Sequence, residues 1–256
     1  MKVAILAGGV GSRLMEETSV RPKPMVEIGG RPILWHIMKR YASYGYSEFV
    51  IALGYKGDYI KRWFVDFASL TSDLTVRTGT GDISATTAHH DDWTVHLVDT
   101  GQRTGTGGRI KRLRAVIGDE RFLLTWGDGV ADVDIDALVA FHDRHGRYCT
   151  LTAARPPARF GHLELEGDRI TEFSEKPQVG EGWINGAFFV CEPEVFDYIP
   201  DERTMFERQP LQKLAADSHL MAYRHDGFWQ CMDTMRDRVL LEQLWEAGNP
   251  PWRNWS

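Results

Sequence analysis

A glycine-rich segment near the start of the chain lies close to two cationic side chains. Gly8-Gly9-Val10-Gly11 follows the short apolar run 3–7, and Arg13 and Lys23 come soon after it. Backbone N–H groups in such a segment can approach and surround an anion, because glycine has no Cβ atom. A planar guanidinium and a mobile ammonium can then reach the same polyphosphate. These residue types, in this order, predict a site for a triphosphate.

The spacing of these glycines differs from that of the two best-known phosphate-binding loops. The segment is neither G-x-x-x-x-G-K-[ST] nor a complete G-x-G-x-x-G, which disfavours a Walker loop and a dinucleotide-binding loop. On the glycines alone, a tight turn without a ligand is an equal alternative.

One aspartate follows a second apolar run that is expected to form a buried strand. Asp128 lies in Gly127-Asp128-Gly129, directly after residues 122–126. At the carboxyl end of a parallel strand, a turn aspartate can hold a hard cation over the crevice of the sheet. The same tripeptide could also be only a turn. Asp233 precedes an amphipathic helix over 235–248, and its position alone predicts that it caps this helix.

A second glycine-rich segment, residues 100–109, joins an expected strand over 93–99 to a helix. Loops of this kind can contact a heterocyclic base through backbone groups, although a flexible connector is the alternative. The near-helical spacing of basic residues 109–114 favours a solvated helix face, with phosphate contact by one of them as the second interpretation. Further along, Glu175-Lys176 and Asn185-Gly186 could form either a salt-bridged rim or part of a binding site.

The elements that must position these residues alternate between apolar strands and amphipathic helices. Strands are expected over 3–7, 49–53, 93–99, 122–126 and 148–154, and helices over 32–44, 57–68 and 135–146. This alternation predicts an α/β fold with a mostly parallel, Rossmann-like sheet flanked by helices. Alternation around Gly167-Asp168 adds an inserted β-hairpin. Residues 1–256 are expected to form a single domain, with a core over about 1–235 and a C-terminal helical extension and tail over about 234–256.

Three further features predict what lies at the surface. Residues 79–92 are small and polar, and they predict a long exposed loop. His142 and His145 predict a surface pair at the end of a helix. Trp252 and Trp255 predict a tail that packs against a neighbouring subunit or against the chain itself.

Composition disfavours several classes of protein. The chain has 256 residues and a net charge of −6, so it lacks the basic field that nucleic-acid binding requires. No apolar run approaches the roughly 20 residues needed to span a bilayer, and the N-terminus lacks the pattern of a signal peptide. Three cysteines without metal-type spacing fit a reducing compartment. We therefore expect a soluble cytoplasmic protein that binds neither nucleic acid nor a membrane.

The first glycine-rich segment resembles a known signature. Leu6-Ala-Gly-Gly-Val-Gly-Ser-Arg-Leu14, followed by Pro22-Lys-Pro-Met25, is similar to that of the nucleotide-sugar pyrophosphorylases, a family of nucleotidyltransferases. Ser12 stands where threonine is commoner, and both residues carry a hydroxyl. The segment from Val98 to Arg112 resembles one branch of the family, the glucose-1-phosphate cytidylyltransferases. The likeness runs from residue 1 to about 252 and implies an α/β fold of the nucleotide-diphospho-sugar transferase type.

The resemblance implies that CTP reacts with a sugar 1-phosphate, expected to be α-D-glucose 1-phosphate, to give a CDP-sugar and pyrophosphate. It implies that Asp128 and Asp233 hold Mg²⁺. The implied nucleotide-binding residues are Leu6, Ala7, Gly8, Gly9, Gly11, Ser12, Arg13, Lys23, Thr104, Gly108, Arg109 and Asp128. The implied residues for the sugar phosphate are Glu175, Lys176, Asn185 and Gly186. The implied catalytic residues are Arg13, Lys23, Asp128 and Lys176.

The attacking group in this reaction is already an anion, so no protein nucleophile or general base is required. Catalysis would consist of positioning and charge neutralisation. UTP or dTTP is an alternative to CTP. A different sugar also stays open, because Trp126, Trp183 and Ala187 depart from the pattern of the branch. A catalytically silent nucleotide-sugar-binding subunit is a further alternative, and the resemblance implies a homo-oligomer, with a hexamer as one option.

Overall fold

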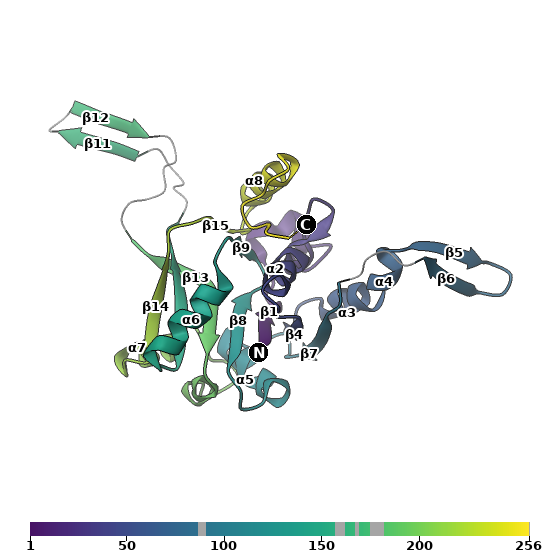
Figure 1. The fold of residues 1–256 in the computed structure, drawn as a ribbon, viewed down its shortest axis with the longest axis horizontal. Helices are drawn as coiled ribbons and strands as arrows, with labels where there is room; N and C mark the ends of the chain where they lie inside the picture. The colour runs from purple at the N-terminus through teal and green to yellow at the C-terminus, as the bar shows by residue number, and fades with distance from the viewer. Residues whose placement is uncertain (87–90, 157–161, 167–168, 175–181, 256) are drawn as a thin grey trace.

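A seven-stranded mixed sheet forms the centre of the described chain. The computed structural model describes residues 1–86, 91–156, 162–166, 169–174 and 182–255. In spatial order, the strands are β14 (Leu220–His225), β10 (Cys149–Ala154), β13 (Ile184–Cys191), β8 (Phe122–Trp126), β1 (Lys2–Leu6), β4 (Glu48–Leu53) and β7 (Thr94–Asp99). β13 runs antiparallel to both of its neighbours, and the other pairs are parallel. The predicted α/β fold with a mostly parallel sheet is confirmed (Figure 1).

Helices cover both faces of this sheet. The longer ones are α2 (Ile33–Ala42), α3 (Gly57–Val65), α5 (Thr106–Ile117), α6 (Ile135–His145), α7 (Gln209–Ala216) and α8 (Met235–Glu246); shorter ones are α1 (Met15–Thr18), α4 (Phe67–Leu70) and the 3₁₀ turns Ser12–Leu14, Lys23–Met25 and Pro193–Tyr198. Val3 and Ile5 of β1 lie in one buried cluster with α2, α6 and α8. Ala4 and Leu6 lie in a second cluster with α5 and α7. Successive side chains of a strand point to opposite faces, so a strand covered on both faces must be apolar throughout.

Several two-stranded ribbons border the sheet. They are β2 (Glu27–Ile28) with β3 (Arg31–Pro32), β5 (Asp73–Arg77) with β6 (Asp82–Thr86), β9 (Gly129–Ala131) with β15 (Trp229–Cys231), and β11 (His162–Glu166) with β12 (Arg169–Ser174). The β11–β12 pair confirms the predicted hairpin, whose turn at 167–168 lies outside the described residues.

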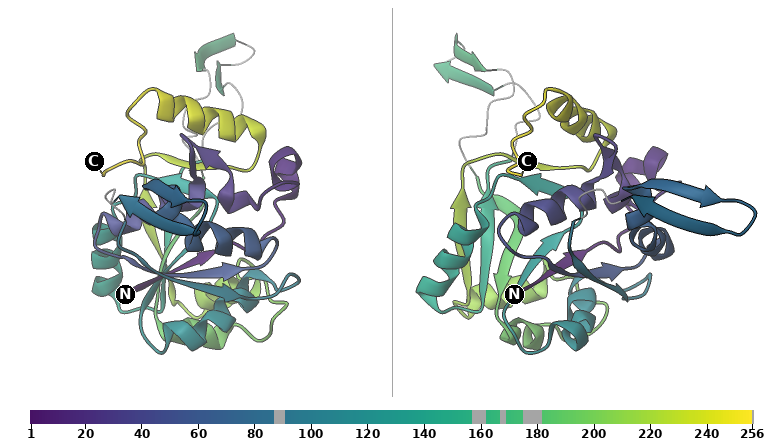
Figure 2. Two further views of the ribbon diagram at one scale, coloured as in Figure 1. Left: turned by 90° about the vertical axis from the view of Figure 1, so that its right-hand side faces the viewer. Right: turned by 45° about the vertical axis from the view of Figure 1, so that its right-hand side comes forward.

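The β5–β6 ribbon projects away from the body of the molecule (Figure 2). Its second strand corrects the prediction of a loop over 79–92, because β6 occupies part of that segment. The strand signal there is the alternation of Ile83 and Ala85 with polar neighbours, which is short and interrupted by glycines nearby. No helix in the described ranges is both long enough and apolar enough to cross a lipid bilayer.

The structure also places a histidine and a tryptophan in the interior. The prediction of a surface position is wrong for His142, which is 1% exposed and contacts Thr150 Oγ1 (2.7 Å) and Glu192 Oε1 (3.2 Å). Burial lowers the pKa of His142, because an imidazolium would lose its hydration there. Trp252 is fully buried in the chain's own core, which confirms one of the two predicted positions for the tail.

His36 and Trp252 form a buried polar contact that fixes the tautomer of the histidine. Nε2 of His36 lies 2.8 Å from Ile28 O, and Nδ1 lies 3.4 Å from Trp252 Nε1. An indole N–H can only donate, so Nδ1 accepts that bond and Nε2–H donates to the carbonyl. Burial, with Arg31 and Arg253 acting in the same direction, lowers the pKa of His36 to about 4.

We expect acid to destabilise the protein through His36. An unfolded histidine titrates near pH 6.5, whereas the folded one stays neutral because its pKa is about 4. The unfolded state therefore binds an extra proton as the pH falls through 6.5. Stability is lost between about pH 6.5 and 4, with a loss of about 2 kcal/mol between about pH 7 and 5. The free energy of unfolding in urea, measured at those two pH values, should fall by about 2 kcal/mol less in His36→Gln than in wild type. An equal fall in both proteins would contradict this role of His36.

Candidate active site

The glycine-rich segment turns at the carboxyl end of β1, where the sequence predicts a triphosphate site. Gly11 has φ +64°, in the left-handed region that favours glycine, and a Cβ atom there would lie 2.9 Å from Thr18 Cγ2. Gly8 is required by a close contact instead, because a Cβ atom would lie 2.3 Å from Arg109 Nη1. These two glycines therefore let the segment run close to its neighbours.

Arg109 forms hydrogen bonds that link both glycine-rich segments to the end of β4. Its Nη1 donates to Leu53 O (3.0 Å) and Gly101 O (2.8 Å), and its Nη2 donates to Gly8 O (3.1 Å). All five hydrogen bonds described for this guanidinium end on neutral oxygen atoms. Arg109 is 5% exposed, and burial lowers its pKa. Because none of these partners carries a negative charge, the guanidinium favours an anion in its neighbourhood.

The second glycine-rich segment ends earlier than predicted, because α5 begins inside it. Gly105 N–H donates to Glu202 O at 2.8 Å, and Gly107 N–H donates to Thr204 O at 2.9 Å. The start of the helix is therefore paired with another segment of the chain at these two N–H groups. A Cβ atom on Gly108 would lie 2.1 Å from Glu202 O, so this glycine is needed for the packing.

A small ribbon brings two aspartates together. β9 pairs antiparallel with β15, with Gly129 opposite Cys231, and Asp128 O accepts from Met232 N at 2.8 Å. In an antiparallel pair, the residue before one strand faces the residue after the other. Asp128, which precedes β9, therefore lies opposite Met232, the residue before Asp233.

The ammonium group of Lys23 lies between these aspartates. Nζ lies 2.7 Å from Asp128 Oδ2 and 2.5 Å from Asp233 Oδ1, and Arg13 Nη1 lies 3.1 Å from Asp233 Oδ2. Burial opposes the charged ammonium, but Asp128 and Asp233 outweigh it and raise the pKa of Lys23. Burial also opposes the charge on Asp233, but Lys23 and Arg13 lower its pKa. The expectation that Asp233 caps α8 is wrong, because Thr234 is the N-cap.

A cleft of about 320 Å³ opens beside this charged cluster, which is large enough for part of a small-molecule ligand. The predicted nucleotide-binding residues that line it are Leu6, Ala7, Gly8, Gly9, Gly11, Lys23, Thr104, Arg109 and Asp128. Ser12 and Arg13 lie in the adjoining 3₁₀ turn, and Gly108 is buried in α5 and is not part of the lining. Gln102, Trp126 and Met205 line the cleft without having been predicted as nucleotide-binding. Gln102 belongs to the second glycine-rich segment and could have been found there, whereas Met205 has no recognisable signal.

The structure describes two of the four residues predicted for the sugar phosphate. The other two lie outside the described residues: Glu175 and Lys176. Asn185 Oδ1 accepts from Ala187 N at 2.8 Å, and Gly186 O accepts from Trp229 Nε1 at 2.8 Å. Ala187 has φ +60°, a conformation that is unfavourable for a residue with a Cβ atom. The Asn185 side chain therefore supports a strained irregularity in the first half of β13.

The two aspartates suit Mg²⁺ if a substrate completes its coordination. No group of three or more metal-binding side chains occurs in the part of the chain that the structure describes. Proteins usually hold Mg²⁺ with one or two carboxylates, substrate phosphates and water. Asp128 and Asp233 supply two carboxylates that converge on one point, which fits an ion that binds together with a nucleotide. Lys23 Nζ lies within 2.7 Å of one oxygen of each carboxylate, so a cation bound by those two oxygens would take its place.

The nucleotidyl transferase family model matches residues 2–239, and the chain belongs to this family. Within the family, the chain is similar over its whole length to the glucose-1-phosphate cytidylyltransferase of Salmonella typhi, with 50% identity over 257 residues and 100% of both chains covered. The mannose-1-phosphate guanylyltransferase catalytic subunit beta of Dictyostelium discoideum is more distant. It is 29% identical, and the match covers 93% of this chain and 62% of that protein.

Solved structures share the fold at low sequence identity. HddC from Yersinia pseudotuberculosis superposes with a TM-score of 0.70 at 22% identity, and the match covers 95% of this chain and 99% of that one. A UDP-glucose pyrophosphorylase complexed with UDP-glucose gives a TM-score of 0.68 at 16% identity, covering 96% and 98%. The α/β sheet flanked by helices is therefore the architecture of known sugar nucleotidyltransferases.

We expect Arg109→Lys to weaken the binding of CTP, the nucleotide that the sequence predicts. A single ammonium group cannot span from Gly8 O to Gly101 O, and each buried carbonyl left unpaired costs about 1–3 kcal/mol. The dissociation constant of CTP should rise at least ~10-fold and the Tm should fall by several degrees. Arg112→Lys, on the same helix but more exposed, is the matched control for both measurements. Wild-type affinity in Arg109→Lys would show that Arg109 does not organise the cleft.

Proposed function

We propose that the chain transfers the cytidylyl group of CTP to α-D-glucose 1-phosphate and releases pyrophosphate. The observation that carries this proposal is the 50% identity, over the full length of both chains, with a glucose-1-phosphate cytidylyltransferase. The cleft supports it, because the glycine segment, Lys23 and Asp128 line one space in which a triphosphate can be neutralised. Other nucleotides and sugar phosphates share the same phosphate groups, so the choice of CTP and glucose rests on the likeness.

The proposed reaction brings two anions into contact. A phosphate oxygen of the sugar phosphate attacks the α-phosphorus of CTP, and a new oxygen–phosphorus bond forms. The bond between the α-phosphorus and the oxygen that bridges to the β-phosphate breaks, and pyrophosphate leaves with the electron pair. Each contact between like unit charges costs roughly 4 kcal/mol at 4 Å with an effective dielectric constant of 20. The chain must therefore supply cations at this point, and it needs no nucleophile of its own.

The glycine segment, and the charged cluster of Arg13, Lys23, Asp128 and Asp233 beside it, each have a role in this reaction. The N–H groups of the glycine segment and the guanidinium of Arg13 bind the leaving β- and γ-phosphates. Lys23 neutralises charge on the phosphates of the nucleotide. Asp128 and Asp233 would hold Mg²⁺, which would supply positive charge at the α-phosphate.

We assign the sugar phosphate to Glu175, Lys176, Asn185 and Gly186, of which the first two lie outside the described residues. The family motifs suggest this group, in which Lys176 is the cation for the incoming phosphate. The register of the sheet supports the position of Asn185. β13 is antiparallel to β8, with Phe188 opposite Thr125. The first residues of β13 therefore lie beside the end of β8 and the turn after it, which carries Asp128.

Release of pyrophosphate from four nucleoside triphosphates and several sugar 1-phosphates, with Mg²⁺ present, tests the proposed function. We expect release with CTP and glucose 1-phosphate, and formation of CDP-glucose. Asp128→Asn and Lys23→Ala should each lower kcat/KM at least ~10²-fold, because each removes one preorganised electrostatic contact. Lys61→Ala, at an exposed lysine of α3, should keep wild-type turnover. If no pair releases pyrophosphate, a silent nucleotide-sugar-binding subunit becomes the better interpretation.

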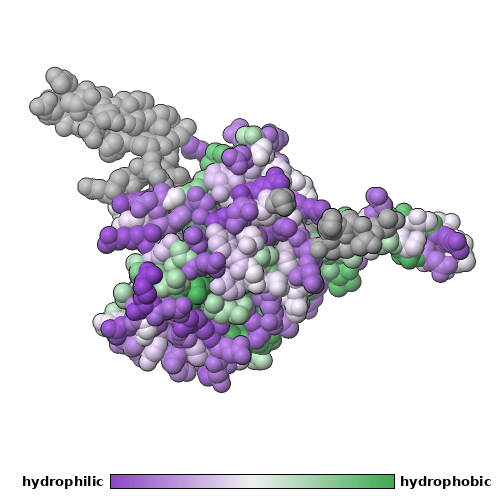
Figure 3. Space-filling view, in the orientation of Figure 1, coloured by the Kyte–Doolittle hydropathy of each residue, from purple (hydrophilic) through white to green (hydrophobic). Residues whose placement is uncertain are grey.

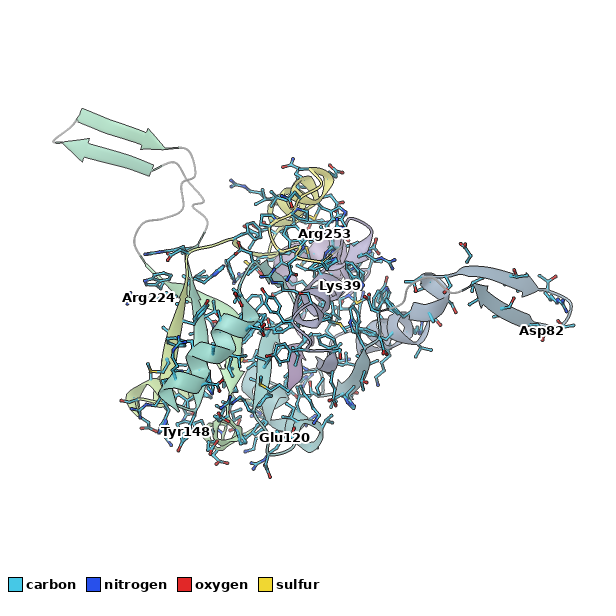
Figure 4. All side chains as sticks on the ribbon, viewed as in Figure 1. Lys39, Asp82, Glu120, Tyr148, Arg224 and Arg253 are labelled. Carbon is cyan, nitrogen blue, oxygen red and sulfur yellow. The ribbon has the colours of Figure 1, made fainter. Side chains whose placement is uncertain are left out.

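We also propose that the chain forms a homo-oligomer through the β5–β6 ribbon. The register pairs Leu74 with Ala85 and Val76 with Ile83, so four apolar side chains share one face of the ribbon. Leu74, Val76 and Ile83 are exposed. Figure 3 shows apolar surface on this projection and where it joins the body, and Figure 4 labels Asp82 at its far end.

A second copy of the chain can cover this face. A two-stranded ribbon is marginally stable by itself in water, and an exposed apolar face usually marks a contact surface. The apolar face of one ribbon is complementary to the same face of another, which a two-fold symmetric contact requires.

Val76→Asp should lower the oligomer mass, because it places a charge on the apolar face of the ribbon. Thr75→Asp, on the opposite face of the same strand, is the matched control and should leave the mass unchanged. Light scattering coupled to gel filtration measures both at one protein concentration. A monomeric wild type, or a Val76→Asp variant of unchanged mass, would rule out this contact.

We also infer that residues 1–256 form a single domain. Leu241 of α8 and Trp252 of the tail belong to the same buried cluster as Val3 and Ile5 of β1. The helix and tail after about residue 234 therefore share the core of the preceding residues, and this supports one domain.

A further inference from the structure

The backbone around Asp233 is held by a carboxylate on the first turn of α8. Asp237 Oδ2 accepts hydrogen bonds from the N–H groups of Asp233 (3.1 Å) and Thr234 (2.8 Å), and from the Thr234 hydroxyl (2.8 Å). In return, Asp237 N–H donates to Thr234 Oγ1 at 3.3 Å, which completes a capping box. The side chain of Asp233 takes no part in the cap and instead contacts Lys23 and Arg13.

The other oxygen of Asp237 ties this cap to the ribbon that brings the two aspartates together. Oδ1 accepts from Gln230 Nε2 at 3.1 Å, and the same amide donates to Cys231 O at 2.7 Å. Gln230 is 4% exposed and lies in β15 opposite Val130 of β9. One carboxylate therefore links the start of α8 to β15 and, through the ladder, to the strand that follows Asp128.

We propose that Asp237 is a positioning residue that sets the affinity of this site for a divalent cation. It acts through Asp233, because it fixes the peptide from which that carboxylate projects toward Asp128. Hydrogen bonds that orient metal ligands commonly account for roughly 10- to 100-fold in metal affinity. The inference rests on the proposed function, since it takes Asp128 and Asp233 as the metal-binding pair.

A helix cap with no effect on the metal is the alternative, and α6 supplies a matched control for it. Asp134 caps α6, where its Oδ1 accepts from Ala137 N at 2.9 Å, and it lies outside the lining of the cleft. Asp134→Ala removes one capping acceptor, whereas Asp237→Ala also removes the partner of the buried Gln230 amide, so both should lower the Tm and Asp237→Ala by more. Only Asp237→Ala should change the metal dependence.

Equilibrium dialysis of labelled CTP, with no sugar phosphate present, measures how far Mg²⁺ tightens nucleotide binding without any turnover. We expect Asp233→Asn to remove this gain in affinity and Asp237→Ala to reduce it about 10-fold. Asp134→Ala should keep the gain. Asp237→Glu should keep most of it, because glutamate at this position also completes a capping box. Gln230→Met removes one donor while it keeps the side-chain size, so it should reduce the gain less and serves as the second variant if Asp237→Ala does not fold.

The possible failures can be told apart. If Asp233→Asn loses the effect of Mg²⁺ but Asp237→Ala and Gln230→Met keep it, Asp237 is only a helix cap and the inference is wrong. If Asp233→Asn also keeps the effect, the metal-binding pair of the proposed function is wrong and the inference fails with it. If wild-type protein does not bind CTP, the proposed nucleotide is wrong.

Discussion

The contact of one ammonium group with two carboxylates is the interaction on which the site depends. Asp128 and Asp233 come from distant parts of the chain, and two like charges 4 Å apart repel by roughly 4 kcal/mol at an effective dielectric constant of 20. Lys23 lies within hydrogen-bond distance of both, and its side chain is 11% exposed, so water screens these contacts less than at an open surface. The β9–β15 ribbon can therefore hold two carboxylates side by side, an arrangement that suits a divalent cation.

The positive charge in the cleft also comes from nearby groups. A chain with a net charge of −6 has no general attraction for a polyphosphate, so the field in the cleft must come from groups that line it. Arg109 contributes a buried charge whose hydrogen-bond partners are all neutral. Because those partners belong to both glycine-rich segments, one side chain supplies part of the field and also fixes the loops. Gly8 matters for this arrangement, since a side chain there would collide with the guanidinium.

The sequence predicts the parts of the site that follow apolar strands. β1 and β8 are continuous apolar runs, and in a parallel sheet their carboxyl ends share one edge, so the glycine segment and Asp128 are expected to lie together. The features that sequence alone does not predict depend on distant segments. Gly108 is required by the carbonyl of Glu202, and the burial of His142 depends on Glu192, far along the chain. For Trp252, the sequence leaves two positions open, and only the packing of the whole chain decides between them. The pattern of neighbouring residues in the sequence does not predict contacts between segments that are far apart in the chain.

Cation binding and phosphate binding are coupled by the position of Lys23. Lys23 Nζ contacts one oxygen of each carboxylate, so a divalent ion held by those two oxygens would replace the ammonium group there. The lysine would then need another anion, since a partly buried ammonium group without a partner is unfavourable. A nucleotide phosphate bound in the adjacent cleft would supply that anion and a further ligand for the ion. The distances from Lys23 to the two aspartates thus favour a site that takes the metal and the nucleotide together rather than the metal alone.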